Sequence, residues 1–218
     1  IMPDNIEKFG YSILQPPLEA LNIVYPTENL TLTTLQEIGK LRESDSEKES
    51  ELPIRENIIG KRGLKNIMTY TEKAGNPPQR NNFKYKPWVQ EKYGNIFSPD
   101  LIGNFSSKMK NISEIILKSK GIILIYSQYI DGGIVPMSLV LEELGFTKYN
   151  SQSLFQTPPK EQIDSITMET KTNYSGNRFL PAKYAVITGD KALSPNNVEI
   201  MKKITDDDNK DGSKIKVI

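Results

Sequence analysis

The sequence predicts an α/β fold, in which a doubly wound parallel sheet is preceded by a loop-rich, mainly helical arm. From residue 106 onward, helical and strand-like patterns alternate in the order helix, strand, helix, strand, helix, strand. That is the order of parallel strands joined by helices. Before Pro99, prolines and short helical patterns dominate, and proline breaks a chain into extended pieces.

The arm, residues 1–103, is predicted to contain two short helices. Apolar spacing favours one over 32–41 and another over 64–73. The Asn-Pro-Pro sequence at 76–78 ends the second, because proline cannot continue a helix. The stretch 75–99 is expected to be rich in loops.

Charge is unevenly spread along this arm, although the net charge of the chain is only +1. Residues 42–51 carry five acids with three serines between them, as in a solvated, disordered insert. Residues 60–87 carry seven basic residues and one acid, and aromatic residues lie within and beside them: Tyr70, Phe83, Tyr85 and Trp88. Basic side chains with interleaved aromatics suit phosphates and stacked bases, which makes Lys61, Arg62 and Lys65 a candidate basic patch. The alternative is a solvated face whose aromatics pack inward.

The α/β part, residues 104–218, is predicted to open with a helix over 108–118. Residues 106–107, both serine, supply its N-cap, and Gly121 stops it. Its apolar side chains recur at helical spacing: Met109, Ile112, Ile115 and Ile116. The continuous apolar run at 122–126 then predicts a strand buried on both faces of a parallel sheet.

A second helix is predicted from Pro136 to Gly145, since proline is favoured at the start of a helix and glycine after its end. A polar insert over 147–182 delays the next strand, 184–187. Ser-Pro at 194–195 then caps a third helix, whose apolar positions are Val198, Met201 and Ile204.

The last predicted strand, 214–218, is an apolar run with no turn after it, so we expect the second domain to be truncated at this strand. The N-terminus has neither the basic flank nor the apolar core of a signal peptide, and we expect it to be cut as well. No apolar stretch approaches the roughly 18–20 residues that span a bilayer. The sequence therefore predicts no membrane partner and a cytoplasmic location.

The composition excludes several classes of chemistry. The chain has no cysteine and no histidine, which excludes disulfides, Ser-His-Asp and Cys-His catalysis, and the usual zinc sites. The phosphate-binding loop G-x-x-x-x-G-K-[ST] is absent. The acidic cluster at 206–208 follows a helix in a turn, and we interpret it as solvated. We therefore predict neither catalytic residues nor metal ligands in this chain.

Polar residues follow two of the predicted strands. Ser127-Gln128-Tyr129 comes after the first strand, and Thr188-Gly189-Asp190 comes after the second. In doubly wound sheets, ligands bind at the carboxyl ends of the strands. From the residues alone, these clusters are either a binding edge or loops that are polar because they face water.

The order of these segments resembles the second RecA-like lobe of superfamily 2 helicases and translocases. A lysine before an apolar helix is followed by GIILIYSQY, LEELGF, YAVITGD and IKVI, and Swi/Snf-like ATPases have an LIFSQ-type motif at the first of these strands. The chain is most similar to the helicases of nucleocytoplasmic large DNA viruses, a group that includes poxvirus transcription ATPases and giant-virus helicases. The resemblance covers about residues 104–218, and the preceding residues resemble the region that links the two lobes.

The resemblance implies a role in nucleic-acid binding for each of five residues. Ser127 and Gln128 would donate hydrogen bonds to backbone phosphates, without reading sequence. Thr188 would do the same, and Gly189 would permit close approach of a nucleic-acid strand. Asp190 would orient neighbouring amides or a 2′-hydroxyl, because it would repel a phosphate.

A sixth residue, Lys108, would tether the lobe interface or meet a phosphate, and its alternative is an exposed first-turn lysine. In the intact protein the resemblance implies ATP and Mg²⁺, held mainly by the missing first RecA-like lobe and by motifs V and VI, so the fragment alone would be inactive. It implies DNA or RNA as partner, together with transcription machinery, in host cytoplasm or virion. The rival hypothesis is a non-enzymatic module that binds nucleic acid or a transcription complex without ATP.

Overall fold

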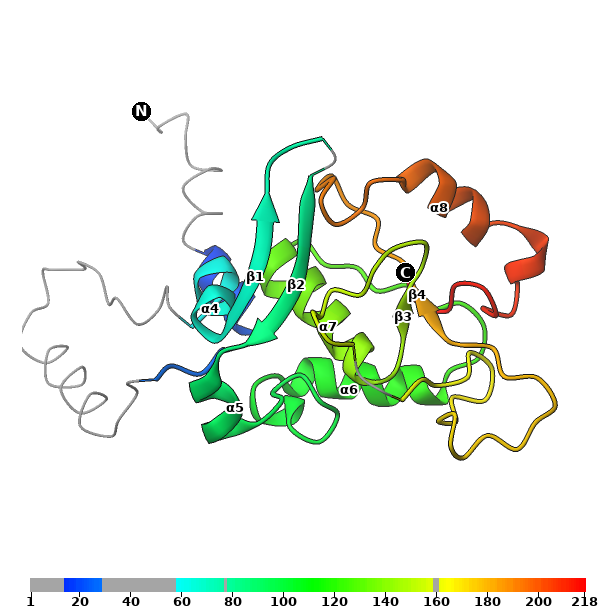
Figure 1. Ribbon diagram of the computed structural model, residues 1–218, viewed down its shortest axis with the longest axis horizontal. Coiled ribbons are helices and arrows are strands. Elements are labelled where there is room, and N and C mark those ends of the chain that lie inside the picture. Colours follow the sequence, from blue (N-terminus) through cyan, green and yellow to red (C-terminus); the bar gives the residue numbers. More distant parts are fainter. Residues whose placement is uncertain (1–13, 29–57, 77, 159–160) are drawn as a thin grey trace, which may run out of the picture.

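The computed structural model describes residues 14–28, 58–76, 78–158 and 161–218 (Figure 1). The helix predicted over 32–41 and the acidic insert over 42–51 lie outside these residues. At a coarse level the fold is α/β, as the sequence predicts, with short strands and helices packed around one main core.

The helix α4 (Gly60–Ile67) begins and ends earlier than the sequence predicts. The prediction of a helix over 64–73 is wrong in its second half, where the chain forms the strand β1 (Met68–Lys73). Residues 69–71 are Thr-Tyr-Thr, and β-branched and aromatic side chains favour a strand. The arm is therefore less helical than predicted.

A β-hairpin fills much of the region predicted to be loop-rich. β1 pairs antiparallel with β2 (Gln79–Tyr85), and α5 (Pro87–Tyr93) follows directly. The buried residues of β2 are Arg80, Phe83 and Tyr85, and the first two are three residues apart because the pairing with β1 shifts register between them. The sequence QRNNFKY hides this pattern, because the spacing is irregular and one of the inward residues is an arginine.

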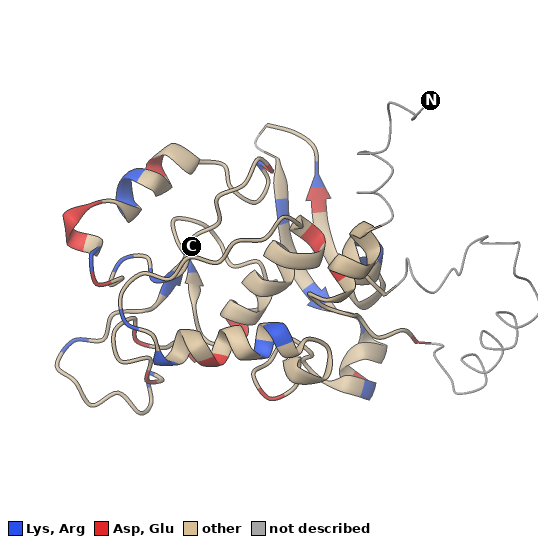
Figure 2. Cartoon of the chain, turned by 180° about the vertical axis from the view of Figure 1, so that it is seen from behind, with Lys and Arg blue, Asp and Glu red and all other residues tan. Residues whose placement is uncertain are grey.

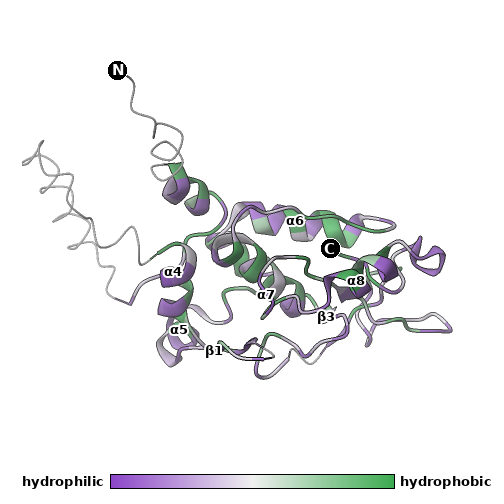
Figure 3. Ribbon diagram, turned by 90° about the horizontal axis from the view of Figure 1, so that it is seen from above, coloured by the Kyte–Doolittle hydropathy of each residue, from purple (hydrophilic) through white to green (hydrophobic). Residues whose placement is uncertain are grey.

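Two predicted helices of the second part are confirmed. The helix α6 (Ser107–Lys118) is capped by Ser106, whose Oγ accepts a hydrogen bond from Met109 N at 3.0 Å. The helix α7 (Val135–Glu143) carries Pro136 in its first turn and follows a π-helical turn, η2 (Ile130–Ile134). Every residue of α7 except the last is buried, and this helix is the apolar centre of the molecule (Figure 3).

Four parallel segments are joined by backbone hydrogen bonds. β3 (Thr147–Lys148) pairs with β4 (Lys183–Tyr184), and Val217 bridges both Tyr184 and Ile123. The spatial order is therefore 122–126, 215–218, 183–186, 147–149. In the described chain these segments yield only one two-stranded parallel sheet beside the antiparallel hairpin, not a wide doubly wound sheet.

The structure changes the expected place of two strands. The last segment, 215–218, has a neighbour on each side, 122–126 and 183–186. The segment 122–126 is not buried on both faces, as predicted, because Leu124 is 76% and Tyr126 87% exposed. It lies at the outer end of the parallel set.

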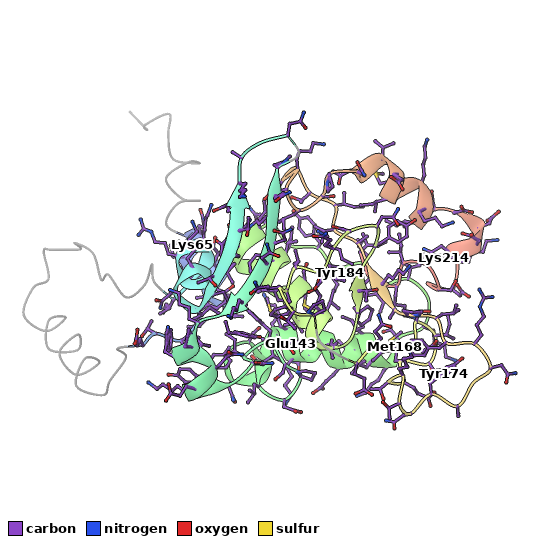
Figure 4. The ribbon with its side chains drawn as sticks, viewed as in Figure 1. Lys65, Glu143, Met168, Tyr174, Tyr184 and Lys214 are labelled. Atoms are coloured by element: carbon purple, nitrogen blue, oxygen red, sulfur yellow. The ribbon has the colours of Figure 1, made fainter. Side chains whose placement is uncertain are left out.

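The polar insert over 147–182 is anchored to the core by a buried carboxylate. Glu142 of α7 is 1% exposed and accepts hydrogen bonds from four donors: Leu154 N at 2.7 Å, Phe155 N at 3.0 Å, Tyr184 Oη at 2.8 Å and Ser153 Oγ. The insert therefore packs as part of the fold, around Tyr184 in the middle of the molecule (Figure 4).

The remaining helices are short. The helix predicted after 194–195 is α8 (Asn197–Ile204), whose Val198 and Met201 are exposed rather than buried. Residues 14–20 are also helical, and there are two 3₁₀ turns: η1 (Ile102–Asn104) and η3 (Asp207–Asn209).

Candidate nucleic-acid interface at the strand ends

The structure brings the two predicted polar loops to the same edge of the parallel segments. The loop 127–134 follows the segment 122–126, and the loop 188–192 follows the segment 183–186. Only the segment 215–218 lies between these two strands. We refer to the two loops together as the strand-end loops.

Arg80 joins the strand-end loops to each other. This side chain on β2 is 4% exposed and contacts the carboxylates of Asp131 and Asp190, the latter at 3.4 Å. Its guanidinium lies 5.5 Å from the centre of the Tyr70 ring. Burial by itself would lower the pKa of Arg80, but the charge of Asp131 and its hydrogen bond raise it above its ordinary value. The guanidinium is therefore a permanent positive charge between two loops.

Ser127 is committed to its own loop. Its Oγ donates a hydrogen bond to Tyr129 O at 3.1 Å and accepts one from Tyr129 N at 3.2 Å. A Cβ added to Gly133 would lie 2.0 Å from the Ser127 Oγ, so the loop closes tightly over this hydroxyl. Gln128, by contrast, is exposed. Of this pair, only Gln128 presents its side chain outward.

The second loop is ordered by one of its own side chains and by α8. Asp190 Oδ1 accepts a hydrogen bond from Ala192 N at 2.9 Å, and Asn197 Nδ2 donates to Thr188 O at 2.9 Å. Gly189 is exposed, and a Cβ added there would meet no atom within 4 Å. Asp190 therefore acts inside the protein, while Gly189 leaves its backbone open.

Lys108 lies elsewhere. It is in the first turn of α6, and its Nζ donates a hydrogen bond to Asn22 Oδ1 at 2.8 Å. Ser106 Oγ donates to Asn22 O, and Val24 N donates to Phe105 O at 3.1 Å. Lys108 thus ties an N-terminal segment of this chain to α6.

The candidate basic patch is partly neutralised. On α4, Lys61 and Lys65 both pair with Glu72, at 2.6 and 3.2 Å, and Arg62 lies between them in the sequence (Lys65 is labelled in Figure 4). Hydrogen bonds from the two lysines lower the pKa of Glu72, that from Lys61 most. Both signs of charge occur on the hairpin (Figure 2).

The aromatic residues of the basic stretch face the core. Phe83 is 1% and Tyr85 5% exposed. Tyr70 stacks on Phe83 with ring centres 4.5 Å apart, and Trp88 packs edge-on against Tyr93. Phe83 and Tyr85 are too buried to stack on bases, and the half-buried Tyr70 and Trp88 pack on neighbouring rings, so the inward-packing alternative describes this stretch better.

An apolar groove of about 310 Å³ opens beside the strand-end loops. Its walls are the exposed side of the parallel segments and one side of α7, and they include Leu124, Tyr126, Met137, Val186, Ile187 and Ile218. Ser127 and Gly133 border the groove. The carboxyl edge of the parallel segments therefore has the polar strand-end loops beside an apolar groove.

The described residues were compared with the Mg²⁺ that the resemblance implies, and their acidic side chains form no cluster suited to it. No group of three acidic residues within the described ranges is arranged to hold a metal ion. In the acidic turn, Asp206 and Asp208 pair with Lys203, and Asp207 pairs with Lys210. Among the same residues, no helix is long and apolar enough to cross a membrane.

Sequence reasoning located the two loops but missed Arg80 and Tyr25. Tyr25 Oη donates a hydrogen bond to Asp131 O at 3.1 Å, and Tyr25 is 1% exposed. Neither residue belongs to a recognisable motif. Comparison with known proteins adds no relative, since no family model, no curated protein and no solved structure matches the chain.

Proposed function

We propose that this chain is part of an ATP-dependent nucleic-acid helicase or translocase. In this role it grips the nucleic-acid backbone and takes part in closing two RecA-like lobes. The observation that carries the proposal is the meeting of the two strand-end loops at one edge, joined through Arg80. The sequence resemblance assigns these loops to the same nucleic-acid track.

The parallel segments support a partial RecA-like fold. Backbone hydrogen bonds join four of them side by side in parallel. In the sequence, α7 connects the segment 122–126 to β3. Helical connections between parallel strands are the rule for doubly wound sheets, in which ligands gather at the carboxyl edge. We further propose that these segments belong to a wider doubly wound sheet in the intact lobe.

Three groups at this edge suit a phosphate backbone. The Gln128 amide and the Gly189 backbone are exposed, and the half-buried Thr188 hydroxyl lies next to Gly189 in the chain. Neutral donors of this kind hold phosphates without reading bases. We therefore propose DNA or RNA, bound independently of sequence, as the partner of this edge.

The other parts of the proposal follow from the resemblance. ATP and Mg²⁺ would be held mainly by a first RecA-like lobe and by later motifs, none of which lies in this sequence. Transcription machinery as a further partner, and a host cytoplasm or virion as the location, belong to the same proposal.

The experiment is a binding titration of the full chain with a fluorescent single-stranded oligonucleotide. Changing Gln128 and Thr188 to alanine should cost about 1–3 kcal/mol of binding, the scale of lost hydrogen bonds to charged groups. As a control, changing Lys61 and Lys65 to glutamate should mainly flatten the salt dependence, by about 0.7 in slope for each lost phosphate contact. If charge reversal abolishes binding and the alanine pair changes nothing, the helicase-track assignment fails.

That same outcome would favour the rival function, a non-enzymatic module that binds nucleic acid through α4. The observation in its favour is that Lys61 and Lys65 are about half exposed even though they pair with Glu72. Such binding would need no strand-end loops and no second lobe.

A further inference from the structure

Arg80 comes from the hairpin, yet its charged partners lie in the strand-end loops. It is separated by 51 residues from Asp131 and by 110 residues from Asp190. Both carboxylates are themselves mostly buried, with 19% and 26% of their side chains exposed. One guanidinium thus links three segments of the chain.

The hairpin is also fixed to the rest of the fold by independent contacts. Phe83 on β2 forms a parallel bridge with Phe155, through hydrogen bonds from Phe83 N to Leu154 O and from Gln156 N to Phe83 O. Tyr85 Oη donates to Glu143 Oε1 at 3.2 Å. The position of β2 therefore does not depend on Arg80 alone, and Arg80 can hold the loops from a fixed strand.

The pair of aspartates needs a cation between them. Two carboxylates that face one another in a partly buried place repel each other, and a shared opposite charge removes that repulsion. Arginine suits this task better than lysine, because its planar fork can donate to two carboxylates at once. Loss of Arg80 would leave two like charges that drive the loops apart.

Arg80 is poorly placed to bind a phosphate itself. Only 4% of it is exposed, and an incoming phosphate would have to displace Asp131 or Asp190. The groups that face outward on these loops are Gln128, Gly189 and Lys191. Any effect of Arg80 on a bound strand must pass through the position of those groups.

We propose that Arg80 is a positioning residue of the nucleic-acid interface, which holds the two strand-end loops at the spacing at which both reach one phosphate backbone. The inference rests on the proposed function. It adds that the β1–β2 hairpin contributes to nucleic-acid binding through Arg80.

The test compares Arg80→Lys and Arg80→Ala with Lys84→Ala, an exposed cation on the same strand. Binding of the full chain to oligothymidylate is measured by fluorescence anisotropy at several salt concentrations, and amide hydrogen exchange is followed by mass spectrometry. Arg80→Ala should weaken binding by about tenfold or more, the scale of one lost hydrogen bond between charged groups. Arg80→Lys should restore part of that loss.

Two further readouts separate positioning from direct contact and from general stability. With Arg80→Lys the salt slope should stay unchanged and exchange should quicken at 127–134 and 188–192 but not in α6. With Lys84→Ala the loops should exchange as in the unaltered chain. If Arg80→Lys instead lowers the slope of the salt dependence of binding by about 0.7 and leaves the amide exchange of the loops unchanged, Arg80 is a direct phosphate contact. That result would overturn the proposal.

The remaining outcomes are also decisive. Equal binding by the unaltered chain and Arg80→Ala removes the positioning role and leaves the proposed function standing. Faster exchange throughout the molecule in both Arg80 variants makes the residue an ordinary structural one, which also overturns the inference. If the unaltered chain binds no strand, the proposed function fails and the positioning role fails with it.

Discussion

At the scale of single residues, buried charges hold together segments that are far apart in the sequence. Arg80 joins the hairpin to the strand-end loops, and Glu142 ties α7 to the insert. Asp164 organises the rest of the insert, since it accepts hydrogen bonds from three backbone N–H groups, those of Ile166, Thr167 and Leu180. A buried charge is tolerated only where such partners surround it.

Asp164 should make stability depend on pH. Burial alone would raise its pKa, but the backbone N–H groups, that of Leu180 first, lower it below its ordinary value. A carboxyl with a lowered folded-state pKa contributes stability above its unfolded pKa of about 3.9, and this contribution is lost as pH falls through the folded value. Asp164→Asn should therefore lower the free energy of urea unfolding near neutral pH, and the difference from the unaltered chain should shrink at acid pH.

The matched control is Asp207→Asn, whose side chain is 91% exposed. An exposed ion pair contributes little, so this variant should unfold almost as the unaltered chain does at every pH. A difference for Asp164→Asn that stays the same from neutral to acid pH would contradict the assigned role.

At the scale of elements, the sequence predicted the helices better than the strands. For α6 and α7, an N-cap serine, a proline in the first turn and a following glycine agree with the apolar spacing. The sequence did not predict β1 and β2, because the buried side chains of this hairpin include Arg80. A charged residue does not contribute to a pattern of apolar residues, so the alternation expected of a strand is not visible. The segment 122–126 was correctly expected to pair in parallel, but its composition could not show that one face stays exposed.

The candidate site was predictable only in part, for a similar reason. The positions of 127–129 and 188–190 follow from the rule that loops gather at strand ends. The contact with Arg80 spans separations of 51 and 110 residues, and local patterns carry no information about such pairs. That Ser127 and Asp190 hydrogen-bond within their own loops also depends on the folded backbone.

Two glycines of the strand-end loops should respond differently to alanine. A Cβ at Gly133 would lie 2.0 Å from the Ser127 Oγ, whereas a Cβ at Gly189 would meet nothing within 4 Å. Gly133→Ala should therefore lower the melting temperature, because Ser127 must leave its hydrogen bonds. Gly189→Ala should melt like the unaltered chain but bind a single strand more weakly, since the added methyl blocks close approach.

Calorimetry and an anisotropy titration check the two halves of this expectation. Gly189→Ala with unchanged affinity would show that no strand approaches this backbone. An unaltered melting temperature for Gly133→Ala would contradict the close packing at Ser127.

At the scale of the whole molecule, the proposed function assigns this chain the grip on nucleic acid and assigns ATP hydrolysis to other segments. The sequence has no G-x-x-x-x-G-K-[ST] loop, and the described residues hold no acidic trio for a metal ion. We therefore expect no ATP hydrolysis above background, with or without nucleic acid, in a phosphate-release assay. Magnesium-dependent turnover that a point mutation within this chain abolishes would refute the assignment.

The most direct measurement of the central claim is where a bound strand protects the backbone. Amide hydrogen exchange of the full chain should be recorded with and without saturating oligothymidylate. The account predicts that binding slows exchange most at 127–134 and 188–192, and less in α4. Protection confined to α4, with the strand-end loops unchanged, would contradict it and identify the basic patch as the binding surface.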